Sequence, residues 1–250
     1  MPADRILFTV TLGELAEVPG TPFSYWAPPS LRALFHRYPP LDRDVARRPE
    51  KPKIADVKVG LQTSDDLRFT RHWWEVPAEA IAASREETHQ GKAWVPFAKG
   101  GRPFYHDIAL VVNWGNEGEE IKGYRAPNGR QYSRPQNESF YFRPGLAWAE
   151  VVSAERIEVY RVPRGVICGH TAHEVYPETL EHTWQIIGLL SSAIVSEILR
   201  TLDPLSHHRP SGYVALIPVP NLNFSEVLPQ ATAEAHDLLR EWATGEETAT

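Results

Sequence analysis

Hydrophobic and polar positions change their period along the chain, and the change separates a strand-rich middle from helical flanks. Between residues 57 and 167, short apolar runs alternate with turn-forming residues, which is typical of β-strands joined by short loops. A further apolar run over residues 213–219 predicts a last strand. The clearest expected strands of the middle region are Trp94–Phe97, Ile108–Trp114, Phe140–Phe142, Leu146–Val152 and Ile157–Val162.

Two segments near the C-terminus follow helical spacing instead. Apolar residues recur every three or four positions from Trp184 to Ile198 and predict one long core helix over residues 184–202. Ser225–Ala243 predicts a second, amphipathic helix that packs on the domain or on a partner. Near the N-terminus, residues 31–35 predict one short helix, and the proline-rich segment Pro39–Lys53 predicts an exposed connector.

These elements predict an α+β fold: a mixed β core with flanking helices and a C-terminal amphipathic helix. A chain of 250 residues can bury a sizeable core as one domain, or as one domain with an appendage. We therefore expect a lead-in with a short helix over residues 1–54, a main domain over 55–220, and a helix followed by a disordered tail over 221–250.

Composition narrows the class of protein. The single cysteine, Cys168, excludes an internal disulfide framework and a zinc-type cysteine pair. The N-terminus is a poor signal peptide, and no apolar run is long enough to span a membrane, so a cytoplasmic location without a membrane partner is expected. A net charge of −6 argues against a uniformly basic DNA-binding surface. From Arg125 to Arg143, however, four basic residues accompany only one acidic residue, so a local basic face is possible.

The stretch Val59–Val76 (VGLQTSDDLRFTRHWWEV) contains a strand, a polar turn and an aromatic-rich element. Gly60 permits a close backbone approach that a side chain would prevent. Thr63, Ser64, Asp65 and Asp66 are turn formers whose side chains can hydrogen-bond to their own backbone. These residues alone predict a strand, a polar turn and a second ordered segment.

The same stretch resembles the signature GLxTGxNxRFxRxWxEV of the target-recognition region in BREX-type adenine DNA methyltransferases, the PglX family, and related type IIG restriction-modification enzymes. Ser64 stands where this family usually has glycine, so we expect a different backbone shape at the turn. Further blocks resemble the family in the same order, and the match covers most of residues 19–220. These blocks are Pro19–Trp26, Trp94–Gly101, Val111–Lys122, Tyr141–Ser153 and Tyr160–Ile167, with weaker echoes at Leu189–Ser192 and Ile217–Pro220.

The resemblance implies a target-recognition domain that reads double-stranded DNA beside a catalytic methyltransferase domain or subunit. That partner would methylate adenine at N6 in phage defence or restriction, with S-adenosylmethionine as its cofactor. This chain has neither the glycine-rich turn nor the Asn-Pro-Pro-Tyr-type loop of the catalytic half, so we expect no catalytic residue, metal or cofactor in it. A natural subunit, a split gene product and a truncated fragment remain open.

Sequence readout of DNA requires donors and acceptors that reach base edges, which arginine, asparagine and glutamine supply best. The run Tyr124–Asn137 concentrates such residues without hydrophobic periodicity, so it is the expected readout loop, although a solvated insertion fits its composition equally well. The tryptophans Trp73, Trp94, Trp114 and Trp148 are expected in the core. The candidate DNA-binding residues are Gln62, Thr63, Arg68, Arg71, Lys99, Arg102, Arg125, Asn128, Arg130, Gln131, Arg134 and Gln136.

Three alternatives remain open from the residues themselves. Asp107, Glu120 and Lys122 have the spacing of a carboxylate plus Glu-x-Lys site, which would make the chain a stand-alone Mg²⁺-dependent nuclease. The histidines at positions 170, 173 and 182, with Glu174, offer ligands for a metal, although a solvated loop explains them more simply. The C-terminal helix would instead make the chain a protein-interaction module.

Overall fold

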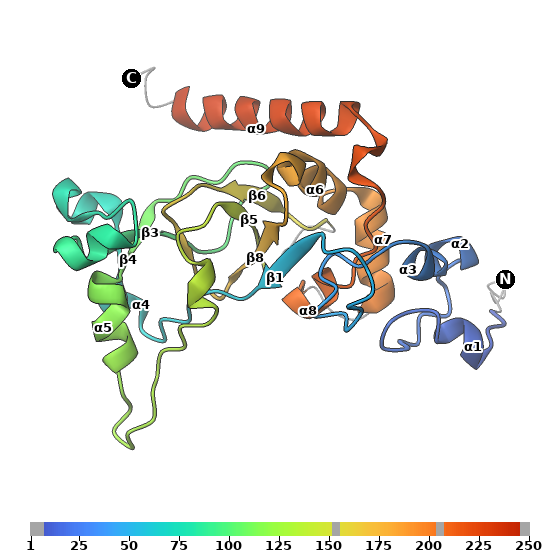
Figure 1. Cartoon of the computed structure of the whole chain (residues 1–250), viewed down its shortest axis with the longest axis horizontal. Helices are drawn as coiled ribbons and strands as arrows, with labels where there is room; N and C mark the ends of the chain where they lie inside the picture. The colour runs from blue at the N-terminus through green and yellow to red at the C-terminus, as the bar shows by residue number, and fades with distance from the viewer. Residues whose placement is uncertain (1–7, 152–155, 204–207, 246–250) are drawn as a thin grey trace, which may run out of the picture.

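The computed structural model describes residues 8–151, 156–203 and 208–245, and it confirms the expected α+β class. Two four-stranded sheets form its centre (Figure 1). In the first sheet, all neighbouring strands are antiparallel. Its strand order is β1 (Ala55–Lys58), β8 (Ala172–Pro177), β5 (Gly145–Ala149) and β6 (Val159–Val162).

The second sheet is antiparallel except for its last pair, β3 and β7, which is parallel. The chain passes directly from β7 into β8, so the two sheets are linked through a three-residue connection. Small and aromatic residues, including Ala98, Tyr160 and Cys168, form a buried cluster contributed by both sheets. The strand order is β2 (Thr70–His72), β4 (Leu110–Asn113), β3 (Trp94–Ala98) and β7 (Ile167–Cys168).

Helices from the C-terminal region cover the first sheet. α6 (Thr183–Leu190), α7 (Ala193–Leu202) and α8 (Ser211–Val214) share the largest hydrophobic cluster with residues of that sheet. α9 (Val227–Gly245) lies across α6 along the upper edge of Figure 1. Gly188 permits this contact, because a Cβ atom there would lie 2.5 Å from Thr232 Oγ1. The expected C-terminal helix is therefore confirmed, while residues 246–250 of the predicted tail lie outside the described part.

The N-terminal lead-in contains α1 (Leu12–Leu15), α2 (Pro29–Arg32) and α3 (Leu34–Arg37). The expected short helix is thus two single turns, which break at Ala33. Arg32 is buried and holds the lead-in together, since it donates to Glu14, Glu17 and the carbonyl oxygen of Ala27. The segment after α3 is not the exposed connector that its prolines predicted. Leu41 is fully buried, and its backbone N–H donates to Ile217 O at 2.9 Å.

Short helical segments surround the second sheet. α4 (Asp66–Phe69) and α5 (Gly115–Gly123) bury Phe69 and Ile121 in a second hydrophobic cluster with Trp114. α5 was not predicted because it is irregular: its residues 116–118 have positive φ angles, and no hydrophobic stripe marks the segment. The remaining 3₁₀ turns are Trp73–Glu75, Ala78–Ala80, Glu86–Gln90, Glu138–Phe140, Leu180–His182 and Leu222–Phe224.

Three sequence predictions about regular elements are wrong in part. The single helix expected over 184–202 is two helices bent by 73°, because Ser192 caps α7 by accepting from Val195 N at 3.4 Å. Residues 138–140 form a 3₁₀ turn where a strand was expected over Phe140–Phe142. The run over 213–219 begins inside α8, although Pro218 then pairs with Pro40 in extended form. Residue 152 of another expected strand lies outside the described residues.

None of the helices in the described residues is long and apolar enough by itself to cross a membrane. Leu180–Leu190 and Ala193–Leu202 meet the length and composition criteria only when taken together, as a sharply bent pair.

Candidate nucleic-acid interface

Residues 124–134 form a hairpin that projects from the body of the protein, at the bottom of Figure 1. Its tip is a tight turn in which Gly129 N donates to Ala126 O at 2.8 Å. Gly129 has φ +81°, a backbone conformation that glycine adopts without steric cost. Below the turn, Ala126 N donates to Arg130 O at 2.8 Å and Tyr132 N to Tyr124 O at 3.0 Å. The segment that the sequence marked as an exposed loop is therefore an ordered projection.

The base of the hairpin is fixed to the polar turn that follows β1. Gln62 and Arg134 exchange two backbone hydrogen bonds of 3.0 and 2.8 Å, and Ser64 Oγ donates to Tyr132 O at 2.7 Å. Ser64 has φ +63°, the left-handed conformation that glycine takes most easily. Two segments about 70 positions apart, which the sequence singled out separately, thus meet at one place.

Gly60 sets the position of this turn. A Cβ atom at residue 60 would lie 2.0 Å from the carbonyl oxygen of Cys168, a contact that no side chain can make. The close approach permits Leu61 N to donate to Cys168 O at 2.8 Å and His170 N to donate to Leu61 O at 2.9 Å. The expectation that Gly60 serves a close backbone approach is confirmed.

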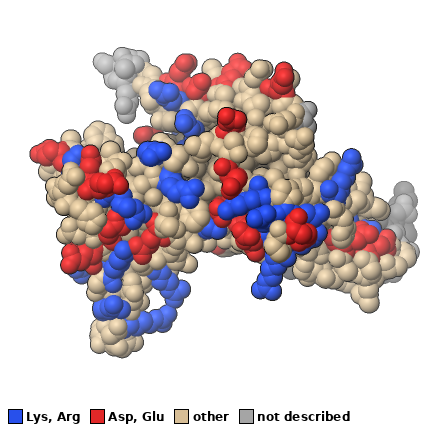
Figure 2. Space-filling view, viewed as in Figure 1, with Lys and Arg blue, Asp and Glu red and all other residues tan. Residues whose placement is uncertain are grey.

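The hairpin carries exposed arginines from its base to its tip. Arg125, Arg130 and Arg134 are solvent-exposed, and within the described residues no carboxylate forms an ion pair with any of them. Figure 2 shows blue side chains of Lys or Arg along the projection at the lower left. Asn128 is also exposed, and its side-chain oxygen accepts from Arg130 N at 3.1 Å. The two N–H donors of the Asn128 side chain are therefore available to a ligand. The side-chain amide of Gln131 lies on the same hairpin, and that of Gln136 lies just beyond it.

Three further candidates lie outside the hairpin, and their side chains are engaged within the protein. Arg68 forms an ion pair with Glu120 at 3.0 Å and lies over the ring of Tyr124 at 5.0 Å. Arg71 donates to backbone carbonyl oxygens of its own segment. The ammonium group of Lys99 is paired with Asp66.

Asp66 is the centre of this internal pairing. Its burial acts to raise the pKa, but hydrogen bonds from Lys99 and Thr63, together with the Lys99 charge, lower the pKa below its ordinary value. Asp66 therefore remains ionised at neutral pH. The carboxylate thus holds Lys99 and Thr63 in place, which restricts both as partners for DNA.

Two candidates do not lie on the hairpin surface. The side chain of Thr63 is buried, with 4% of the residue exposed, and its hydroxyl donates to Asp66, so base readout by Thr63 is a wrong prediction. Arg102 lines a cavity together with Leu239 and Trp242 of α9. α9 lies along the upper edge of Figure 1 and the hairpin at the bottom, so Arg102 does not share the hairpin surface.

The tryptophans divide between core and surface. Trp114 and Trp148 are fully buried as expected, whereas Trp94 is only half-buried. Trp73 is 52% exposed, so its expected place in the core is wrong; neighbouring Trp74 is 59% exposed and stacks on His72 at 4.4 Å. Sequence reasoning missed this exposed pair. Both tryptophans belong to the 3₁₀ turn Trp73–Glu75, which no apolar pattern in the sequence predicted.

The alternative metal sites are not assembled in the described residues, which contain no group of three His, Cys, Asp or Glu side chains able to hold an ion. Asp107 lines the cavity beside α9, whereas Glu120 and Lys122 belong to α5, far from α9 in Figure 1. Glu120 accepts from Arg68 and Asn113, and Lys122 is paired with Glu138. The residues of the proposed nuclease site thus lie in two separate places.

Comparison with known proteins shows that the chain is similar to two adenine-specific methyltransferases. It is 29% identical over 144 residues to adenine-specific methyltransferase PglX of Lacticaseibacillus casei (strain Zhang), covering 55% of this chain and 11% of that protein. It is 24% identical over 226 residues to adenine-specific methyltransferase BrxX of Escherichia coli O9:H4 (strain HS), covering 88% of this chain and 17% of that protein. No protein family profile matches the chain.

These similarities support a methyltransferase-related family. The chain spans less than a fifth of the length of either relative.

Proposed function

We propose that this chain is the DNA-recognition portion of an adenine-N6 DNA methyltransferase of a BREX-type phage-defence or restriction-modification system. In this proposal, the hairpin over residues 124–134 enters a groove of the duplex. A catalytic domain or subunit outside this chain binds S-adenosylmethionine and transfers the methyl group. The observation that carries the proposal is a projecting, hydrogen-bonded hairpin whose exposed arginines have no carboxylate partner in the described residues.

The hairpin has the two kinds of group that sequence-specific binding requires. Arginine side chains neutralise phosphates and also bind guanine edges, and the amides of Asn128 and Gln131 match the donor and acceptor of adenine. Its base is fixed through Gln62 and Ser64, so little conformational freedom is lost when it binds.

The general test is the salt dependence of DNA affinity. Each phosphate contact contributes about 0.9 to the slope of log K against log salt. The variant Arg125→Ala/Arg130→Ala/Arg134→Ala should therefore lower the slope by about 2–3, measured by fluorescence anisotropy with a labelled duplex between about 50 and 200 mM salt. The matched control is Arg240→Ala, which removes an exposed arginine from α9 and should leave the slope unchanged. A wild-type chain whose DNA affinity does not change with salt would refute the proposal.

Base readout has a separate test. Selection from a random duplex library should enrich one motif that contains adenine, and Asn128→Ala should relax the choice at one position. Loss of one good base contact costs about 1–3 kcal/mol in discrimination, with little change in the salt slope. A library that shows no enrichment with the wild-type chain would contradict sequence reading, while leaving phosphate binding intact.

A second function is favoured by one observation on α9. Leu238 and Trp242 are each 60% exposed on this helix, although both are large apolar residues. We propose that this face binds the catalytic portion of the enzyme. Trp242→Ala should then weaken co-purification with the catalytic portion of a relative such as PglX, whereas hairpin variants should not. Retained co-purification in Trp242→Ala and Leu238→Ala would exclude α9 as the docking face.

A further inference from the structure

Three arginines outside the hairpin meet near the ends of β5 and β6. Arg143 precedes β5, Arg161 lies on β6 and Arg164 follows β6. All three are exposed, and no carboxylate of the described residues forms an ion pair with them. In β6 the other three residues are buried, so Arg161 is its only outward-facing side chain.

Two of these arginines lie on the irregular segments next to the last register pair of β5 and β6. The last register pair of β5 and β6 is Gly145 with Val162. Beyond this pair, a turn at residues 164–165 contacts the segment before β5, since Gly165 N donates to Phe142 O at 3.0 Å. The arginines at positions 143 and 164 lie between these two points, one on each segment. Both arginines line the same cavity, so an anion bound there would reduce the repulsion between their like charges.

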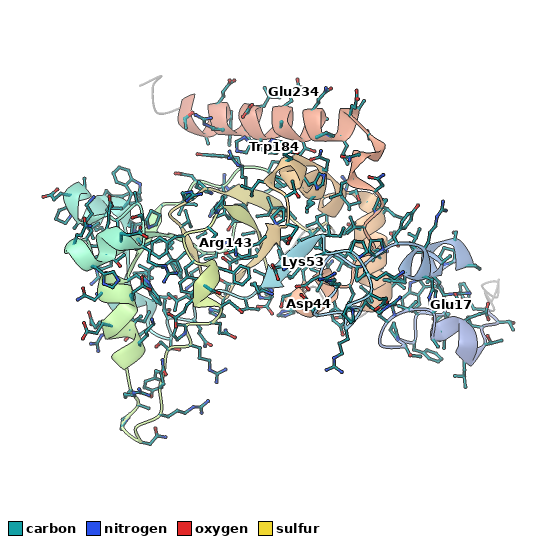
Figure 3. All side chains as sticks on the ribbon, in the orientation of Figure 1. Glu17, Asp44, Lys53, Arg143, Trp184 and Glu234 are labelled. Carbon is teal, nitrogen blue, oxygen red and sulfur yellow. The ribbon has the colours of Figure 1, made fainter. Side chains whose placement is uncertain are left out.

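The surface around them is hollowed. Two adjoining cavities of about 400 Å³ each share Pro144, Arg164 and Leu180 in their walls. Arg143 lines the first cavity and Arg161 lines the second, so the guanidinium groups line one continuous surface. Figure 3 labels Arg143 near the centre of the face shown, where Figure 2 shows a group of blue side chains.

Aromatic rings hold two of the guanidinium groups. Arg143 lies over Phe140 at 4.8 Å and over Tyr176 at 5.5 Å, and Arg161 lies over Trp184 at 5.7 Å. Stacking restrains the plane of a guanidinium group but leaves its N–H donors free along the edge. Such a group can bind a phosphate bidentately with a small loss of side-chain entropy.

The nearby acidic groups do not cancel this charge. Glu86 and Glu178 also line the first cavity, and Glu178 lies 3.7 Å from Lys53. Arg85 lines the same cavity, but its charge is used in an ion pair with Glu117. Around the two cavities together, two carboxylates therefore face four arginines, one of which is already paired.

We propose that Arg143, Arg161 and Arg164 form a second phosphate-binding surface, which holds the sugar-phosphate backbone of the same duplex that the hairpin reads. This inference rests on the proposed function, because it assigns the phosphates to DNA. The surface carries no amide side chain for reading bases, so its contribution is independent of sequence. It positions the duplex, while the hairpin distinguishes one sequence from another.

The test compares Arg143→Ala/Arg161→Ala/Arg164→Ala with the wild-type chain on a mixed-sequence duplex of about 30 base pairs, roughly 100 Å long. The salt slope should fall by about 2–3, and Arg143→Lys/Arg161→Lys/Arg164→Lys should restore most of it because the charges return. Arg240→Ala is again the matched control. If the alanine variant loses its circular dichroism spectrum, the single variant Arg164→Ala replaces it, with an expected decrease of about 0.9.

The outcomes distinguish this inference from the proposed function. A wild-type slope in Arg143→Ala/Arg161→Ala/Arg164→Ala, together with a reduced slope in Arg130→Ala, would overturn the second surface and leave the hairpin intact. Inorganic phosphate provides the other arm. If millimolar phosphate raises the melting temperature of the wild type but not of the alanine variant, while both bind DNA with equal slopes, the surface binds free phosphate and the DNA assignment is wrong.

Discussion

Replacing Gly60 with alanine should destabilise the protein more than any other single added methyl group near the interface. The new Cβ atom would lie 2.0 Å from Cys168 O and 2.7 Å from Cys168 C, which are backbone atoms and cannot rotate away. Relief requires the two segments to separate, which breaks the hydrogen bonds of Leu61 with Cys168 and His170. Two lost hydrogen bonds cost about 1–3 kcal/mol, and overpacking costs about 1–3 kcal/mol more. We expect a loss of about 4 kcal/mol from a total stability of roughly 5–15 kcal/mol.

Urea unfolding followed by tryptophan fluorescence measures this loss as a shift of the midpoint. The matched control is Gly123→Ala at the end of α5, where a Cβ atom would meet nothing within 4 Å, so stability should be unchanged or up to about 1 kcal/mol higher. Gly60 also positions the turn that holds the hairpin. Gly60→Ala should therefore weaken DNA binding even at urea concentrations below its unfolding midpoint, where the variant is still folded. If Gly60→Ala and Gly123→Ala unfold at the same urea concentration, the close-approach argument is wrong.

Three further changes test other parts of the structure. Burial raises the pKa of Glu174 to about 7, so the folded state keeps a proton that the unfolded state has lost. The free energy of unfolding should therefore fall as the pH rises from about 4.5 to 7. Glu174→Gln should remove this fall, which is on the order of 3 kcal/mol, when urea unfolding at pH 5 is compared with unfolding at pH 8. Arg32→Ala should lower the free energy of unfolding by about 2–3 kcal/mol, because it breaks the ion pairs of a buried arginine with Glu14 and Glu17. It should also make the lead-in sensitive to limited proteolysis, whereas the control Arg37→Ala should not. Ser64→Ala should speed amide hydrogen exchange across the hairpin base, because it removes the hydrogen bond from Ser64 Oγ to Tyr132 O, which contributes about 1 kcal/mol. Unchanged exchange would show that this hydrogen bond does not stabilise the hairpin base.

Local patterns in the sequence predicted the regular elements that form short apolar runs or helical apolar stripes. The strands at β3, β4, β5 and β6 and the helix α9 all follow such patterns. The break between α6 and α7 was missed because the apolar spacing runs through Ser191 and Ser192, and only the capping hydrogen bond of Ser192 ends one helix and starts the next. The buried segment at Leu41 was missed because its proline-rich composition is typical of connectors, while its pairing with residue 217 is a tertiary contact.

The candidate interface was predictable in composition but not in arrangement. The sequence marked the hairpin and the Gln62–Asp66 turn separately, and no local rule indicates that Arg134 pairs with Gln62. Nor does composition distinguish an arginine that is paired, such as Arg68, from one that is free. Acidic partners lie far away in sequence, as Glu120 lies 52 positions from Arg68. Arginine counts along the chain therefore overestimate the charge available to DNA.

Ion pairing within the protein explains how a chain with a net charge of −6 can still bind DNA in this proposal. Electrostatic interactions between exposed charges are largely screened beyond about 8–10 Å at physiological ionic strength, so a phosphate responds to its nearest side chains and not to the total charge. At the base of the hairpin, Asp66 and Glu120 are neutralised by Lys99 and Arg68. The hairpin arginines have no such partners among the described residues, so their charge remains available to a ligand. Removing a neutralising partner should consequently weaken DNA binding indirectly. Lys99→Ala leaves the Asp66 carboxylate without its ion-pair partner, and the uncompensated negative charge should repel the phosphates. Asp66→Asn/Lys99→Ala should restore the affinity, and failure of that rescue would mean that Lys99 contacts DNA directly.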